Sequence, residues 1–145
     1  MPIPPFDASG DLPEGIHFAT KEEITARFGA GTQQRQLVTA NLLRVLQLAE
    51  NTGKMERFLV YGSYITAKPA PNDTDVFLVM AADFDSADYM GETAALFDHR
   101  EADRIFGASV FFTPLSAGQA AIDFYLEAWQ MKRGGTKRGI VEVQR

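Results

Sequence analysis

The chain has 145 residues and 46% hydrophobic content, and its 14 Lys plus Arg against 19 Asp plus Glu give a formal net charge of −5. A chain of this length fits a single domain over residues 1–145, with a core that needs no covalent staples. It contains no cysteine, which excludes disulfides, thiolate metal sites and cysteine nucleophiles. Its apolar runs are shorter than a membrane span and its opening does not resemble a leader, so we expect a cytoplasmic protein without a membrane anchor.

The charge is unevenly distributed. Residues 132–145 form a basic C-terminal segment with one acid, Glu142, and five bases: Lys132, Arg133, Lys137, Arg138 and Arg145. The rest of the chain is strongly acidic, which disfavours nonspecific binding of nucleic acid across the whole surface. The basic segment is either a solvated terminus or a local patch that meets a phosphate-bearing ligand.

The first half of the chain predicts an arm and two helices. Proline and glycine make residues 1–19 an extended, irregular arm whose apolar side chains pack on the domain. Thr20 and Glu23 form a capping box that predicts a short helix ending near Gly29. A longer helix is expected over about residues 32–50, with a buried stripe of five apolar residues: Val38, Leu42, Val45, Leu46 and Ala49.

The second half predicts strands that alternate with helices. Apolar runs at residues 58–61, 75–80 and 108–113 read as strands, and residues 62–72 as a loop. Helices are expected over residues 87–97 and from a Ser116–Gln119 capping box to about Met131, the latter apolar nearly all round and so well buried. Residues 140–143 add a last edge strand. The expected fold is α/β (α+β), a small mixed β-sheet with helices packed on it.

The candidate site residues lie at the two ends of the loop over residues 62–72. Gly62 follows a strand and has no Cβ, so a ligand can approach its backbone, and Ser63 offers a hydroxyl to a phosphate oxygen. Asp73 and Asp75 open the next strand and, two residues apart, point the same way. Two adjacent carboxylates repel each other, and a hard cation relieves that repulsion. Without cysteines or paired histidines, the expected metal is Mg²⁺ or Mn²⁺.

Other side chains near this loop have weaker claims. Lys68 lies between the two motifs and is a candidate phosphate ligand, although loop lysines are usually solvated. Tyr61 and Tyr64 flank the Gly-Ser pair, so one of them is a candidate lining residue of a nucleotide pocket. Trp129 is expected in the core, and His99 on the surface.

The order of an apolar strand, Gly-Ser, a short spacer and Asp-x-Asp before a hydrophobic strand resembles the DNA polymerase β-like nucleotidyltransferase superfamily. More narrowly, PIPPFDASGDLPEGIHFATKEEI and YGSYITAKPAPNDTDVFLVM resemble a bacterial family of small uncharacterised proteins placed in or near that superfamily. The resemblance covers residues 2 to about 80 and, more loosely, the final RGIVEV. It implies a minimal nucleotidyltransferase-like fold, phosphate binding by Gly62 and Ser63, and divalent metal binding by Asp73 and Asp75.

The sequence departs from that superfamily at one position. Active members usually bring a third carboxylate from a later strand, and the matching strand here, residues 108–113, contains no acid. Ser109 occupies the expected position, whereas Glu101 and Asp103 precede the strand and are expected in a connecting loop. The departure removes a metal ligand and the activator of the attacking hydroxyl.

Three interpretations follow. In the first, the chain transfers a nucleotidyl group from a Mg²⁺–nucleoside triphosphate to an unknown acceptor hydroxyl, with a protein partner or a homodimer helping to hold the acceptor. In the second, it is a non-catalytic binding or regulatory module, for example one component of a toxin–antitoxin type pair. In the third, it is a structural or interaction domain, and Asp73 and Asp75 merely end a loop.

Overall fold

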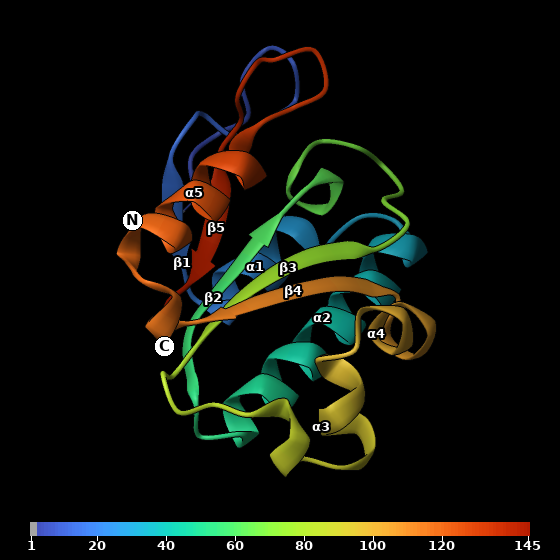
Figure 1. Cartoon of the computed structure of the whole chain (residues 1–145). Helices are drawn as coiled ribbons and strands as arrows, with labels where there is room; N and C mark the ends of the chain where they lie inside the picture. The colour runs from blue at the N-terminus through green and yellow to red at the C-terminus, as the bar shows by residue number, and fades with distance from the viewer. Residues whose placement is uncertain (1–2) are drawn as a thin grey trace.

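The computed structural model describes residues 3–145, so the first two residues of the predicted arm lie outside the described residues. Five strands form one mixed sheet in the order β1-β5-β2-β3-β4, as Figure 1 shows. They are β1 (Ile16–Ala19), β2 (Met55–Tyr61), β3 (Thr74–Met80), β4 (Ala108–Pro114) and β5 (Ile140–Val143). Five α-helices pack on this sheet: α1 (Lys21–Phe28), α2 (Gln33–Asn51), α3 (Gly91–Leu96), α4 (His99–Phe106) and α5 (Gln119–Gln130). The predicted mixed α/β fold is therefore confirmed.

The first two helices begin where their local signals indicate. Thr20 and Glu23 form both bonds of the capping box, Glu23 N donating to Thr20 Oγ1 at 3.1 Å and Thr20 N to Glu23 Oε1 at 2.9 Å. Thr32 caps α2 by accepting from the backbone N–H of Arg35 at 3.1 Å. All five residues of the predicted stripe on α2 are buried. Both helices are thus specified by contacts within a few residues.

The sheet is antiparallel at its centre and parallel at both edges. β2 pairs antiparallel with β3 and with β5, whereas β1 pairs parallel with β5 and β4 pairs parallel with β3. Helices α1 to α4 cover one face and α5 lies on the other (Figure 1). The chain between β3 and β4 forms a crossover through α3 and α4, which parallel pairing requires.

Two predictions about strands are wrong. Residues 16–19 of the arm form β1, an edge strand, instead of irregular chain. Residues 140–143 form β5, which is an inner strand between β1 and β2 rather than an edge strand. Its acid, Glu142, is buried because Arg57 of β2 donates two hydrogen bonds to its carboxylate, at 3.0 and 2.5 Å.

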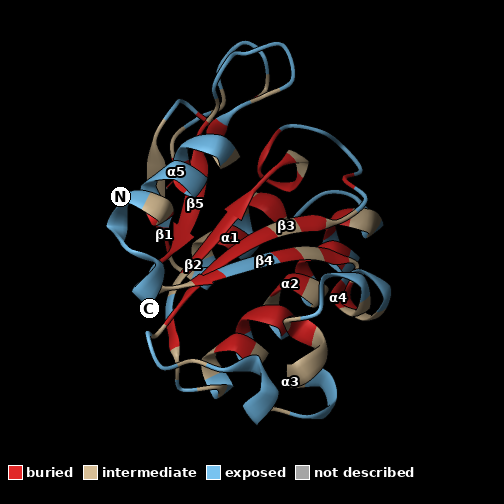
Figure 2. Ribbon diagram, viewed as in Figure 1, coloured by how far each residue is buried: buried red, intermediate tan, exposed pale blue. Residues whose placement is uncertain are grey.

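Three predictions about helices need correction. Residues 87–97 do not form one helix: a 3₁₀ turn at Ser86–Asp88 precedes α3, and α4 follows without having been predicted. The Ser116–Gln119 capping box is absent, because α5 begins after Gly118 with no side-chain cap. Helix α5 is also not well buried; Phe124 is 70% exposed, and Figure 2 shows much of this helix in pale blue.

Within residues 3–145, no helix combines the length and the apolar character that crossing a bilayer requires.

Candidate functional site

The predicted metal pair lies at the start of β3. Asp75 is the second residue of the strand, and Asp73 immediately precedes it; both side chains are partly exposed. Burial raises the pKa of Asp75 to about 6, and the negative charge of Asp73 adds to this rise. Burial also raises the pKa of Asp73, with a further contribution from Asp103. The two predicted carboxylates are therefore close enough to act on each other.

Two neighbouring strands flank Asp75. Its partner on β2 is Tyr61, and its partner on β4 is Ser109. The position at which a third carboxylate was sought is thus occupied by Ser109, whose hydroxyl lowers the pKa of Asp75 and so favours the charged form. Burial and the charges of Asp75 and Asp73 raise the pKa of the Tyr61 phenol, which stays neutral and stacks on Trp129 with ring centroids 4.4 Å apart.

Gly62 brings the backbone against Asp75 itself. Its φ is +83°, in the region that favours glycine, and a Cβ there would overlap Oδ2 of Asp75. Ser63 follows in a 3₁₀ turn, η1 (Ser63–Ile65), and is partly exposed. Gly62, Ser63 and Asp75 therefore lie together, but the space beside Gly62 that the sequence predicted to be open to a ligand is filled by the Asp75 carboxylate.

Tyr64 does not belong to this group. It is fully buried, and its hydroxyl hydrogen-bonds Thr39 Oγ1 at 2.5 Å. Its ring packs against Phe28, with centroids 5.7 Å apart. The 3₁₀ turn after Gly62 points this side chain into the core, so the prediction that Tyr64 binds nucleotide is wrong.

The side chain of Arg35 holds the loop between Gly62 and Asp73 in place by hydrogen bonds to its backbone. Arg35 is only 7% exposed, and its guanidinium donates to four backbone carbonyls. Nη1 donates to Phe28 and Tyr64 at 3.0 and 2.8 Å, and Nη2 to Thr66 and Lys68 at 2.6 Å each. Burial lowers the pKa of Arg35, although four hydrogen bonds occupy the donors of Nη1 and Nη2. Sequence reasoning missed this residue, because its partners are carbonyls that leave no residue-type signal.

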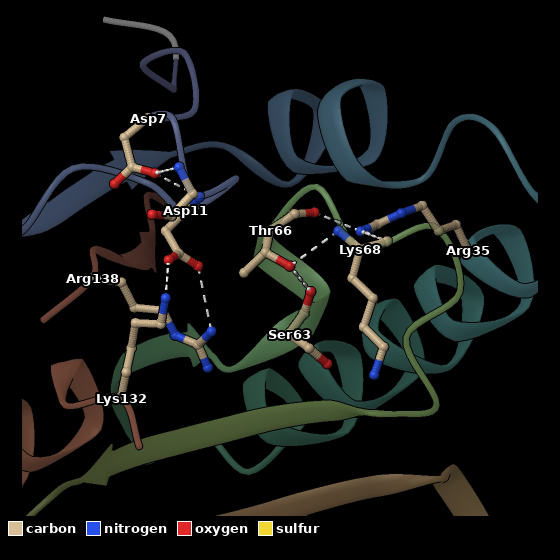
Figure 3. Close-up of polar contacts among 9 residues, drawn as sticks. Asp7, Asp11, Arg35, Ser63, Thr66, Lys68, Lys132 and Arg138 are labelled. Atoms are coloured by element: carbon tan, nitrogen blue, oxygen red, sulfur yellow. Dashed lines mark hydrogen bonds and ion pairs between the residues drawn. The ribbon is translucent and has the colours of Figure 1, made fainter. Parts of the chain in front are cut away.

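Lys68 lies on this loop with its backbone held and its side chain exposed (Figure 3). Its charge lowers the pKa of Asp73, which places the ammonium near the carboxylate pair. Asp103, expected in a loop, lies on α4 and acts on Asp73 as a further acid. In the described part of the chain, however, no three His, Cys, Asp or Glu side chains are grouped so that they could hold a metal ion.

The C-terminal segment also reaches this region, which sequence reasoning noticed only as a basic patch. Arg138 lowers the pKa of Asp75 through its charge, and together with Lys132 it pairs with the buried Asp11 (Figure 3). The arm and the C-terminal segment thus meet beside the carboxylate pair. What the arrangement offers chemically is two close carboxylates, two serine hydroxyls and cations on either side.

The comparisons with known proteins identify a family but no activity. The sequence model of a group described as "Family of unknown function (DUF6932)" matches residues 4–144. No curated protein and no solved structure matches the chain significantly. Because the match covers nearly the whole sequence, the chain belongs to the DUF6932 family.

Proposed function

We propose that this chain binds a divalent cation together with the phosphates of a nucleoside triphosphate at Asp73, Asp75 and Ser63. The observation that carries the proposal is the pair of carboxylates at the start of β3, where burial and then the charge of Asp73 raise the pKa of Asp75. Neither carboxylate forms an ion pair with a side chain of residues 3–145. A bound cation would remove the repulsion between the two carboxylates. The free energy gained by removing it would contribute to the affinity for the metal.

The donor set fits Mg²⁺ or Mn²⁺. Carboxylate oxygens are the ligands these hard ions take. Mg²⁺ commonly keeps several waters and uses only one or two protein carboxylates plus substrate phosphates, so a pair of acids suffices without a closed protein cage. Asp73 and Asp75 would hold the metal, which would supply neutralisation of the phosphate charge, and Ser63 would donate its hydroxyl to a phosphate oxygen.

Ser109 favours binding over catalysis. It stands in register with Asp75, where a third carboxylate would complete a transferase site, and a serine hydroxyl is neither a hard anionic ligand nor a base. We therefore place the chain with the binding or regulatory modules of a nucleotidyltransferase-like fold, in line with the resemblance of its Gly-Ser and Asp-x-Asp pairs.

Calorimetric titration with MgATP and the other Mg²⁺–triphosphates tests this proposal, and a thermal-shift series provides a second readout. We expect saturable, metal-dependent binding in the wild type and none in Asp73→Asn or Asp75→Asn. Asp88→Asn removes an exposed acid from another part of the surface and is the matched control. Equal binding by wild type and Asp75→Asn would contradict the metal–phosphate site.

Nucleotidyl transfer is the second candidate, and Asp103 is the observation that favours it. Its charge raises the pKa of Asp73, so a third acid lies near the pair although it comes from α4 instead of β4. In this reaction an acceptor hydroxyl forms a bond to the α-phosphorus, the bond to the β-phosphate oxygen breaks, and pyrophosphate leaves while the hydroxyl proton passes to a carboxylate. Incorporation of label from α-labelled triphosphate, abolished in Asp103→Asn, would establish transfer over binding alone.

A further inference from the structure

Three cations surround Ser63, two of them from a distant part of the chain. Figure 3 shows Ser63 between Lys68 on one side and the Arg138–Lys132–Asp11 group on the other. Lys68 comes from the loop after β2, whereas Lys132 and Arg138 come from the C-terminal segment between α5 and β5. Lys132 and Arg138 belong to the basic C-terminal segment whose role the sequence left open.

The ion pair with Asp11 does not occupy all the hydrogen-bond donors of Arg138. Lys132 Nζ already pairs closely with Oδ2 of Asp11, which is 5% exposed. Arg138 Nη1 lies at a long 3.5 Å from the other oxygen of the same carboxylate. Its Nε is buried and has no hydrogen-bond partner within residues 3–145. Since a buried donor without a partner is costly, this guanidinium has capacity for a further acceptor.

The charges around Ser63 change sign when a metal is present. Four acids (Asp11, Asp73, Asp75 and Asp103) slightly outnumber the three cations, so the group without a metal repels a polyphosphate. A divalent cation on the carboxylate pair turns the local balance positive. The cations flank that pair, since Arg138 acts on Asp75 and Lys68 acts on Asp73. On this count of charges, we expect triphosphate binding to depend on the metal.

We propose that Arg138, opposite Lys68 across Ser63, binds the terminal phosphates of the triphosphate whose divalent cation Asp73 and Asp75 hold. The inference rests on the proposed function and extends it, because it assigns the basic segment to the polyphosphate and not to the metal. A guanidinium suits this role, since its planar fork donates two parallel hydrogen bonds to a phosphate. Lys132 keeps Asp11 paired while Arg138 turns to the ligand.

Two separate measurements test the inference on the full chain. Electron paramagnetic resonance of Mn²⁺ alone measures the metal site, and calorimetry with MgATP and with Mg²⁺–inorganic triphosphate measures the phosphate site. We expect Arg138→Gln to weaken both triphosphates about tenfold or more, the effect of removing a hydrogen bond to a charged group, while Mn²⁺ affinity is not weakened. Arg133→Gln, an exposed arginine of the same segment, makes the same charge change and is expected to alter triphosphate affinity less than about twofold.

Arg138→Lys protects the test against a folding defect. It keeps the positive charge beside Asp11 but loses the planar fork, so we expect an intermediate loss of triphosphate affinity with Mn²⁺ binding retained. Equal loss in Arg138→Gln and Arg133→Gln would overturn the inference, since only general charge would then matter. Absence of either Mn²⁺ or triphosphate binding in the wild type would overturn the proposed function itself, whereas triphosphate binding that Arg138→Gln does not weaken would overturn only this inference.

A third arm separates the possible sources of phosphate. Competition with a single-stranded RNA oligonucleotide compares a phosphodiester backbone with a terminal triphosphate. We expect inorganic triphosphate to displace MgATP and the oligonucleotide not to do so, because the acidic body repels a long polyanion. Displacement by the oligonucleotide, reversed by Arg138→Gln, would overturn the assignment to a nucleoside triphosphate.

Discussion

The carboxylate of Asp75 lies against the backbone of Gly62, so closely that a Cβ on Gly62 would overlap Oδ2 and come within 3.0 Å of Cγ. The glycine that begins the candidate phosphate loop is therefore required by Asp75, the candidate metal ligand of the neighbouring strand. The two motifs that the sequence presents ten or more residues apart form one steric unit.

Replacing Gly62 tests that contact. Gly62→Ala is expected to lower the free energy of unfolding by about 2 kcal/mol or more, because the new Cβ adds a clash to the cost of a positive φ. Gly118→Ala is the matched control: its φ of +95° and ψ of 154° lie in the same glycine-favouring region as the +83° and −162° of Gly62, but a Cβ there meets no atom within 4 Å. Urea denaturation measures both. Equal losses in the two variants would show that Asp75 does not press on Gly62.

The pH dependence of stability reports the raised pKa of Asp75. A pKa of about 6 in the folded state, against an ordinary 3.8, means that the folded chain binds more protons between these values. The contribution of Asp75 to the free energy of unfolding therefore falls as pH rises from about 4 through about 6. Asp75→Asn is expected to be more stable than the wild type at pH 8, by on the order of 1 to 3 kcal/mol, and to lose this advantage near pH 4.

Urea denaturation at the two pH values, with Asp88→Asn as a control for an exposed acid, provides the measurement. Added Mg²⁺ should raise the melting temperature of the wild type at pH 8 and leave Asp75→Asn unchanged. A variant that is no more stable than the wild type at pH 8 would contradict an uncompensated charge at this position.

Restoring an acid on β4 tests the role of Ser109. Ser109→Asp places a carboxylate in register with Asp75 and is expected to strengthen Mn²⁺ binding about tenfold while destabilising the metal-free protein by about 1 kcal/mol. Ser116→Asp adds the same charge at an exposed position and should change neither quantity. Electron paramagnetic resonance and urea denaturation measure the two effects; unchanged affinity in Ser109→Asp would place the metal elsewhere.

The four carbonyls around Arg35 make a lysine an inadequate replacement. Arg35→Lys keeps the charge but loses the fork, leaving buried carbonyls unpaired, so we expect a loss of about 3 kcal/mol or more in the free energy of unfolding. Hydrogen exchange should accelerate over residues 62–72. Arg44, which is also on α2, forms a half-exposed ion pair with Glu92 of α3. Arg44→Lys should therefore lower the free energy of unfolding by less than about 1 kcal/mol. Comparable costs would deny Arg35 a special role.

Local signals in the sequence predicted α1 and α2 correctly, because a cap and an apolar stripe act within a few residues. The place of β5 depends on partners far along the chain. Residues 140–143 were predicted as an edge strand, and only the pairing of Glu142 with Arg57, 85 residues away, explains how the acid is buried in an inner strand. Helix α4 was not predicted, although it has a local N-cap signal: Asp98 accepts a hydrogen bond from Glu101 N at 3.1 Å. The apolar side chains of α5 predicted a well-buried helix, but Phe124 and Tyr125 are exposed in the structure.

The candidate site likewise contains some residues that the sequence could predict and others that it could not. Gly62, Asp73 and Asp75 were predictable because they stand at the ends of two adjacent strands. The neighbour Tyr64 was not, since a single 3₁₀ turn decides whether its ring faces the site or the core. Arg138 reaches the site through a pairing with Asp11, 127 residues away, and no spacing rule connects them.

The inner position of β5 has a consequence for how this chain is made. Until residues 140–143 have left the ribosomal tunnel, β1 has no strand to pair with and one side of β2 is open. The sheet therefore closes only after nearly all of the sequence that matches the family has been synthesised. A nascent chain would expose unpaired strand edges until residues 140–143 emerge, so we expect it to need chaperones up to that point.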